Sequence, residues 1–195
     1  MKIKADMPDI DIYPKRVAII VGHAKGAPGS SNPSVGTEWD YNSMIAETPI
    51  LKEVADIFYY DNFKKGYVTT VIEDMAPKTK NYDLVVELHF NSFYYEQANG
   101  VEGLYYYKNE NMRILCEEFC DRIHYEFGSI IRGAKALKGH RDRGFACVYY
   151  QTPPTIMVEP FFCTGLEADN FDEPHEKERY AKVLRELIAW YEINY

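Results

Sequence analysis

The feature that most constrains the fold is a short aliphatic run that ends on a glycine and a histidine. Residues 17–21 are aliphatic and mostly β-branched, and Gly22 and His23 follow them directly. The next stretch, residues 24–36, is rich in Gly, Ser, Pro and Asn, so it cannot extend a strand. Such a run is typical of a fully buried strand. Ligands in an open α/β sheet bind beyond the carboxyl ends of its strands. His23 therefore lies where such a sheet forms its ligand-binding site.

Two later strands end in the same way. Residues 83–88 run into His89, and residues 155–158 run into Glu159. Parallel strands bring their carboxyl ends to one edge of a sheet, and that edge is where an α/β protein places its functional side chains. We therefore predict that His23, His89 and Glu159 lie at one edge of one sheet.

The remaining pattern alternates between strand-like and helix-like segments, which is typical of an α/β fold with a mostly parallel twisted sheet flanked by helices. Residues 1–195 are expected to form one domain, with residues 1–15 as an extended lead-in. A helix is expected from Glu38 to about Phe58, with a break just before Pro49. The other expected elements are strands over residues 66–72 and 104–107, helices over residues 111–127 and from Pro174 onward, and a loop over residues 132–144.

Composition and charge narrow the possible partners. The 195 residues are 46% hydrophobic and 27% charged, as in an ordinary globular protein. The net charge of −8 and the lack of a basic cluster argue against nucleic acid and against anionic lipid surfaces as partners. No stretch approaches the ~20 apolar residues of a membrane span. Residues 1–15 have scattered charges and no apolar core, so we expect no signal peptide, synthesis in a cytoplasm and no stable membrane association.

The four cysteines carry no redox or zinc-ribbon signature. Cys116 and Cys120 are four residues apart on an expected helix, and Cys147 and Cys163 are isolated. The C-x-x-C spacing of redox and zinc sites is absent. We expect all four to be reduced core residues.

The residues at the strand ends suit zinc. A catalytic zinc site uses three protein ligands, commonly His nitrogens and a carboxylate oxygen, and leaves one position for water. His23 and His89 are two candidate ligands, and Glu38, at the start of the helix after the first loop, is the best-placed carboxylate. Taken alone, each histidine is more simply interpreted as a structural residue, and Glu38 as a helix-capping residue. The coincidence of the strand ends favours the metal site.

Glu159 then has a different role. Zinc lowers the pKa of its bound water, but a positioned carboxylate must still accept the proton and pass it to a leaving amine. A glutamate between Val158 and Pro160, at the end of an apolar strand, is costly to bury without such a role. The alternative is an exposed carboxylate at a strand end.

Several motifs resemble one family when they are taken together. The residues around His23 are similar to the opening strand of the zinc-dependent N-acetylmuramoyl-L-alanine amidases of the family-3 type. Residues 38–42 (EWDYN) resemble that family's Glu-x-x-x-Asn helix start, and residues 88–91 (LHFN) resemble its Ile-His-x-Asn segment. Two later segments resemble its Arg-Gly-x-Lys and Pro-x-x-Leu-Val-Glu-x-x-Phe motifs: residues 132–135 (RGAK) and 154–162 (PTIMVEPFF). The motifs occur in the family's order over residues 16–190.

The resemblance implies a zinc exopeptidase/amidase-like sandwich and an enzyme that hydrolyses the amide between N-acetylmuramic acid and L-alanine in peptidoglycan. It implies zinc (Zn2+) held by His23, Glu38 and His89, with Glu159 as the catalytic carboxylate. The family usually has Asp-x-Gly-His-Gly-Gly around the first histidine, whereas here the sequence is VGHAK.

Two further residues are candidates for supporting the site. Glu87 stands where the family commonly has a small serine, and strand alternation points it to the same side as His89. It is either a hydrogen-bonding partner of the site or a salt-bridged residue at the core edge. Asn91 is a second candidate for support. His140, in the expected loop, either lines the groove or lies on a solvated surface.

The expected biological role is a phage endolysin catalytic domain that acts on the cell wall after its release from the host cytoplasm. A bacterial amidase that lacks its leader is the alternative to this role. Three other interpretations stay open: a zinc peptidase that cleaves within the stem peptide, a non-catalytic wall-binding module, and an amidase for a small soluble amide. The sequence leaves host, stem-peptide specificity, pH optimum and oligomeric state open.

Overall fold

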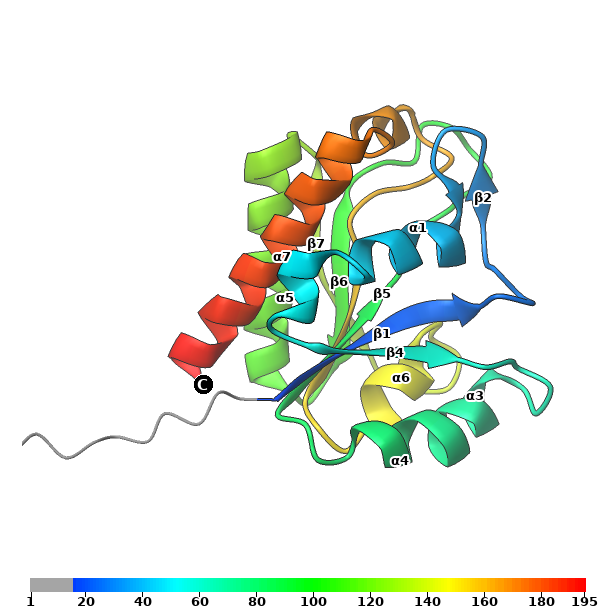
Figure 1. Cartoon of the computed structure of the whole chain (residues 1–195), viewed down its shortest axis with the longest axis vertical. Helices are drawn as coiled ribbons and strands as arrows, with labels where there is room; N and C mark the ends of the chain where they lie inside the picture. Colours follow the sequence, from blue (N-terminus) through cyan, green and yellow to red (C-terminus); the bar gives the residue numbers. More distant parts are fainter. Residues whose placement is uncertain (1–15) are drawn as a thin grey trace, which may run out of the picture.

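A six-stranded sheet crosses the molecule, and helices cover both of its faces (Figure 1). The computed structural model describes residues 16–195, and the expected lead-in over residues 1–15 lies outside them. The sheet order is β4-β1-β5-β8-β6-β7. The strands are β1 (Val17–Ala24), β4 (Asp56–Tyr60), β5 (Leu84–Leu88), β6 (Val101–Tyr106), β7 (Ile131–Leu137) and β8 (Thr155–Glu159).

The sheet is mostly parallel, as the alternating pattern predicts. β1 pairs in parallel with β4 and β5, β5 with β8, and β6 with β7, whereas β6 and β8 run antiparallel. The strands β1, β5 and β8 are therefore consecutive parallel neighbours, and their carboxyl ends share one edge. Every residue of β5 is buried, which explains why this strand is apolar except at Glu87.

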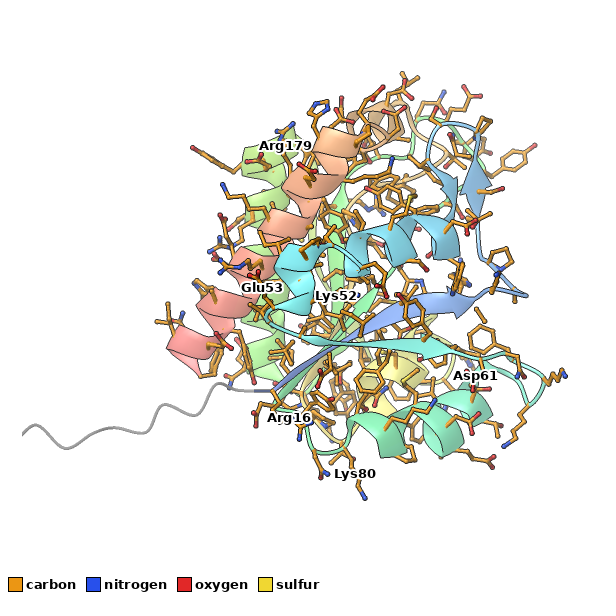
Figure 2. The ribbon with its side chains drawn as sticks, in the orientation of Figure 1. Arg16, Lys52, Glu53, Asp61, Lys80 and Arg179 are labelled. Carbon is orange, nitrogen blue, oxygen red and sulfur yellow. The ribbon has the colours of Figure 1, made fainter. Side chains whose placement is uncertain are left out.

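One face of the sheet is covered by the helices α1 (Glu38–Ala46), α2 (Pro49–Lys52), α5 (Glu110–Phe127) and α7 (Pro174–Asn194). The predicted stripe on α5 is buried, and Gly128 ends this helix in the left-handed conformation with φ of 75°. Arg179, on the upper part of α7 in Figure 2, donates to Glu126 of α5 (2.6 Å) and ties the two helices together.

The opposite face carries α3 (Tyr67–Thr70), a π-helical turn (Val71–Met75), α4 (Ala76–Thr79) and α6 (Phe145–Tyr150). The predicted strand over residues 66–72 is therefore wrong. Val71 and Met75 are buried four residues apart, and Tyr67 packs against the same cluster, so the apolar residues follow a helical repeat. The π turn lies just before Pro77, which has no N–H to donate to a regular helix.

Two edge strands also differ from the prediction. The expected helix from Glu38 breaks before Pro49 as predicted, but it ends at Lys52, and the chain then forms the edge strand β4. The expected loop over residues 132–144 begins as the edge strand β7. β4 is mostly half-buried, and β7 is mostly half-buried or exposed, so neither strand has the continuous burial of a strand in the sheet interior.

A two-stranded ribbon of β2 (Ser31–Asn32) and β3 (Gly36–Thr37) precedes α1, and a 3-10 turn (Leu166–Asn170) precedes α7. All four cysteines are buried and unpaired, as expected. Within residues 16–195, none of the helices has the length and hydropathy that a bilayer span requires.

Candidate active site

His23 reaches the site through an irregularity at the end of β1. The pairing of β1 with β4 shifts register between Val21 and Ala24, and His23 itself has φ of 66°. A left-handed backbone is uncommon for a residue other than glycine, and such strain concentrates at functional sites. The irregularity turns the His23 ring away from the strand and toward the first turn of α1.

His89 follows β5 directly and is held on both ring nitrogens. Its Nδ1 lies 2.7 Å from Glu38 Oε1, and its Nε2 lies 2.9 Å from Glu87 Oε1. Gly22 on the neighbouring strand makes room for this ring, because a Cβ at Gly22 would lie 2.4 Å from His89 Nε2. His89 therefore directs Nδ1 to the shared carboxylate while Glu87 fixes the ring from behind.

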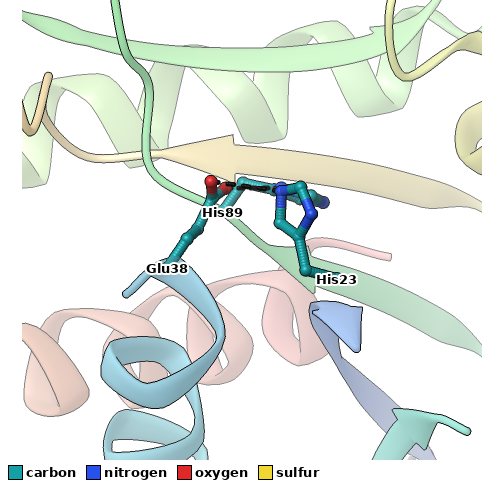
Figure 3. A group of neighbouring side chains, drawn as sticks. All are labelled: His23, Glu38 and His89. Atoms are coloured by element: carbon teal, nitrogen blue, oxygen red, sulfur yellow. Dashed lines mark hydrogen bonds and ion pairs between the residues drawn. The ribbon is translucent and has the colours of Figure 1, made fainter. Parts of the chain in front are cut away.

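Glu38 joins the two histidines. It is the first residue of α1, and its Oε2 lies 3.1 Å from His23 Nε2 (Figure 3). The backbone N–H groups of Phe90 and Ser30 also donate to this carboxylate, at 3.1 Å and 3.3 Å. Burial raises the pKa of Glu38, but the hydrogen bonds from the two histidines outweigh burial and hold the pKa well below its usual value.

His89 shows the complementary shift. Burial lowers the pKa of His89, and the hydrogen bonds to Glu38 and Glu87 outweigh this effect and raise the pKa. Glu38, Glu87 and His89 therefore hold opposite charges close together in a buried position, which core packing alone does not require.

The three side chains match the donor set of a divalent metal site. One ligand atom from each of His23, Glu38 and His89 lies within 4.8 Å of the other two. Two imidazoles and a carboxylate are the chemistry that zinc prefers. Gly29 lines the group, since a Cβ there would lie 2.6 Å from His23 and 2.7 Å from Glu38. The geometry thus fits a bound metal, and the role of these residues as ligands stays a prediction.

Glu87 is fully buried on the side of His89 away from Glu38. The hydroxyls of Tyr60 and Tyr67 donate to its carboxylate, at 3.0 Å and 3.2 Å. Burial raises the pKa of Glu87, but the hydrogen bond and charge of His89, together with the hydrogen bonds from Cys147 and Tyr60, outweigh burial and lower the pKa. A carboxylate that receives the second N–H of a ligand histidine is the usual support of a metal site.

Glu159 lies in the same pocket but outside this cluster. It ends β8, and the side-chain amide of Asn91 donates to it at 2.6 Å. The same amide donates to Glu102 at 2.7 Å, and Glu102 in turn accepts from Arg132 Nε at 2.6 Å. Glu102 and Glu159 are direct partners across the antiparallel β6–β8 pair. Asn91 therefore links two neighbouring carboxylates.

The pKa of Glu159 responds to this environment. Burial is the largest cause and, together with the negative charge of Glu102, raises the pKa to about 8, against the opposing effect of His89. A carboxylate with a raised pKa is suited to accept a proton and then to donate it near neutral pH.

The pocket between these groups has a volume of about 180 Å³. Its floor contains His23, Glu38 and His89, and its wall includes Glu102 and Glu159. The segment after β7 contributes Arg143 and Gly144 to the mouth. His140 instead packs on Phe145, with ring centroids 5.1 Å apart, on the exposed side of that segment.

Comparison with known proteins identifies the chain. The family described as N-acetylmuramoyl-L-alanine amidase matches residues 17–189, which is nearly the whole chain. This chain belongs to that family. It is therefore an N-acetylmuramoyl-L-alanine amidase, an enzyme that acts on peptidoglycan.

Solved structures agree with this assignment. The catalytic domain of the CD27L endolysin, which targets Clostridia difficile, has 26% identity and a TM-score of 0.70, with 90% of this chain and 97% of that chain covered. An N-acetylmuramoyl-L-alanine amidase from Clostridium difficile 630 shares the fold at 18% identity, with a TM-score of 0.74 and 93% and 99% coverage.

A third structure, the catalytic domain of the amidase CwlV from Bacillus (Paenibacillus) polymyxa, shares the fold at 20% identity, with a TM-score of 0.68 and 91% and 97% coverage. No curated protein sequence matches this chain. The amidase domain fold is thus shared over almost the full length of each of these catalytic units.

The structure brings together the residues that the sequence predicts for the site and adds two charged side chains to the pocket lining. His23, Glu38, His89, Glu159, Glu87 and Asn91 all lie in or beside the pocket. Glu102 and Arg143 line the same pocket but were not predicted. A glutamate inside the strand after the Asn99-Gly100 turn was the available signal for Glu102, since a charge on a buried strand is expensive.

Proposed function

We propose that this amidase is zinc-dependent, with His23, Glu38 and His89 as the metal ligands and Glu159 as the catalytic carboxylate. The observation that carries the proposal is the Glu38 carboxylate, which joins the two imidazoles at the floor of the pocket that also contains Glu159. A zinc ion bound there supplies a water of lowered pKa and polarises the scissile carbonyl.

The chain's own residues then handle the proton. Glu159, in its ionised form, accepts a proton from the attacking water as the water oxygen forms its bond to the carbonyl carbon. When the carbon–nitrogen bond breaks, Glu159 returns this proton to the amine of L-alanine. Asn91 donates to Glu159 throughout and keeps the carboxylate aimed into the pocket. The products are a lactyl carboxylate and a free amino terminus.

Glu87 acts through His89. Because it accepts from Nε2, it leaves the Nδ1 lone pair for the metal. The hydroxyls of Tyr60 and Tyr67 hold Glu87 in turn, so the ring orientation of His89 is set before any metal binds.

We also propose that the domain serves as a phage lysin. The support is the similarity to the catalytic domain of an endolysin, the one comparison above that reaches 26% identity. Its test is lysis of intact bacteria by added protein, measured as the loss of turbidity, with the Glu159→Gln variant as the negative control.

The catalytic roles are tested by hydrolysis of purified peptidoglycan. We expect Glu159→Gln to retain its zinc and to lose activity by about 100-fold or more, because the proton acceptor is gone. A glutamate on the surface of α5, replaced in Glu110→Gln, is the matched control and should stay active.

The products separate the competing reactions. New L-alanine amino termini with intact muramic acid identify the amidase, whereas new termini within the stem peptide identify a peptidase. A wild-type protein that hydrolyses peptidoglycan equally well after complete chelation would overturn the metal assignment.

A further inference from the structure

Two hollows flank the catalytic pocket. The first, which we name the aromatic hollow, has a volume of about 360 Å³ and is lined by Phe93, Tyr95, Gln97, Ala98, Arg132 and Phe162. The second, the arginine hollow, has a volume of about 280 Å³ and is lined by His23, Phe63, Tyr67, Arg143, Gly144 and Met157.

Both hollows are connected to the pocket. The arginine hollow shares His23 and Arg143 with it. The aromatic hollow adjoins it through Arg132, which donates to Glu102 in the pocket wall, and through Phe93, which follows the pocket residue Ser92. A substrate whose amide lies in the pocket therefore has one hollow available for the group on each side of the amide bond.

The aromatic hollow offers rings and no free charge. Phe93 and Tyr95 are 55% and 60% exposed, although large aromatic side chains gain by burial. The guanidinium of Arg132 lies 4.9 Å from the centre of the Phe162 ring, and its charge is already paired with Glu102 at 2.6 Å. This surface suits an uncharged ring whose C–H groups can pack on aromatic faces.

The arginine hollow offers a free cation. Arg143 is exposed at the mouth of the pocket and makes no hydrogen bond or ion pair with any residue among 16–195. Other arginines, such as Arg113 and Arg179, are paired with glutamates. An unpaired guanidinium at a pocket mouth binds carboxylates strongly, often through two parallel hydrogen bonds.

We propose that the substrate crosses the pocket in one direction, with its glycan strand in the aromatic hollow and its peptide over Arg143. The proposal rests on the proposed function, since it takes the scissile amide to lie between His23 and Glu159. The sugars next to the amide are uncharged rings, whereas the peptide carries carboxylates. The opposite direction places the peptide carboxylates beside an arginine that is already paired and leaves Arg143 facing a neutral sugar.

Binding to defined fragments tests the peptide half of the proposal. The background is Glu159→Gln, so the measured quantity is Kd and no turnover is needed. The probes are N-acetylmuramoyl peptides with the peptide carboxylates free or converted to amides. We expect Arg143→Gln to weaken binding of the free-acid probe by about tenfold and to leave the amide probe unchanged, because a charged hydrogen bond is lost.

Arg141→Gln is the matched control for this half. Arg141 lies on the same segment, is exposed and does not line the pocket or either hollow. Its replacement should leave both Kd values unchanged. Equal losses with Arg141→Gln and Arg143→Gln, or an equal loss on the acid and amide probes, would overturn the assignment of the peptide.

Probes of different glycan length test the other half. We expect Phe93→Ala and Tyr95→Ala to weaken binding of a probe with additional sugars by roughly fivefold and to leave the single-sugar probe almost unchanged. Tyr94→Ala is the matched control, because Tyr94 is 90% exposed on the same loop and does not line the hollow.

The reverse pattern overturns the proposed direction. In that pattern, the effect of Arg143→Gln on Kd depends on the glycan length of the probe. The effects of Phe93→Ala and Tyr95→Ala on Kd then depend on whether the peptide carboxylates are free. Loss of the proposed function has a separate signature, because wild-type protein would then fail to release L-alanine termini from peptidoglycan whatever the Kd values are.

Discussion

Gly22 brings the backbone of β1 close to the His89 ring. Its Cα faces His89, directly after the neighbouring strand β5, and a Cβ there would lie 2.5 Å from the Leu88 carbonyl oxygen as well as 2.4 Å from the His89 ring. Neither neighbour can yield easily, since one is backbone and the other is held by Glu38 and Glu87. Glycine is thus required at position 22 because the His89 ring and the Leu88 carbonyl oxygen lie close to its Cα, and not because of a turn conformation.

We predict that Gly22→Ala displaces His89 and lowers zinc affinity by about tenfold or more, as happens when the support of a ligand is disturbed. The measurement is a zinc titration in competition with a chelator. Gly26→Ala is the control, because nothing lies within 4 Å of a Cβ at Gly26. An unchanged affinity in Gly22→Ala would show that His89 is not a ligand or that its position is not critical.

Glu102 affects Glu159 through charge and through the shared Asn91 amide. The negative charge of Glu102 contributes to the raised pKa of Glu159. Glu159 must be ionised to accept a proton, so activity should fall as the pH falls through its pKa. Removal of the neighbouring charge lowers that pKa and leaves a weaker base.

We therefore predict that Glu102→Gln shifts the acidic limb of the pH–activity profile to lower pH and reduces kcat several-fold. The profile of kcat between about pH 5 and 9 checks this, together with the zinc content. Glu117→Gln, which removes another arginine-paired glutamate, should leave the profile unchanged. A fall in kcat with no shift of the limb would reduce Glu102 to a structural role.

Among the elements, the first turn of α1 determines where Glu38 lies. Thr37 caps this helix, because its hydroxyl oxygen accepts from the Asp40 N–H at 3.1 Å and its hydroxyl donates to the Asp40 carboxylate at 2.6 Å. The helix N-terminus also favours a negative charge at this position. The cap therefore contributes both to the stability of α1 and to the geometry of the site.

We predict that Thr37→Ala lowers the free energy of unfolding by about 1 kcal/mol. Urea denaturation measures this as a lower midpoint with an unchanged slope. Thr152→Ala is the control, because Thr152 is exposed and its hydroxyl makes no hydrogen bond with any residue among 16–195. A loss as large in Thr152→Ala as in Thr37→Ala would rule out the cap as its cause.

The secondary-structure elements differ in how well their sequences predict them. The stripes of α5 and α7 and the buried strands β1, β5 and β8 were predicted because burial on a defined face leaves a periodic pattern. The edge strands β4 and β7 were missed because half-buried or exposed edge strands need no such pattern. Their pairing partners, β1 and β6, hold them through backbone hydrogen bonds.

At the scale of the whole molecule, the proposed metal ligands come from three elements that are distant in sequence. β1, α1 and the residue directly after β5 contribute one each, so a complete site exists only in the folded chain. An ion that binds only the folded state stabilises it by mass action.

We predict that zinc raises the unfolding temperature, and that free zinc at 100 times its Kd adds about 2.7 kcal/mol. Differential scanning calorimetry with zinc and then with a chelator measures this. Glu38→Gln should lose the response, whereas Glu110→Gln on the surface of α5 should keep it. If zinc does not change the unfolding temperature of the wild-type protein, the proposed metal site is wrong.

By itself, the sequence determined that His23, His89 and Glu159 follow buried strands, and hence that they meet at one edge of a parallel sheet. This prediction was possible because a short aliphatic run is stable in few environments other than the interior of a sheet. Only the tertiary structure decided that Glu102 lies opposite Glu159, that Arg143 reaches the pocket mouth and that Tyr60 and Tyr67 hold Glu87. Those contacts depend on strand order, on register and on the path of the segment after β7. Strand order and register are set by packing across the whole sheet, and no local pattern of residues records them.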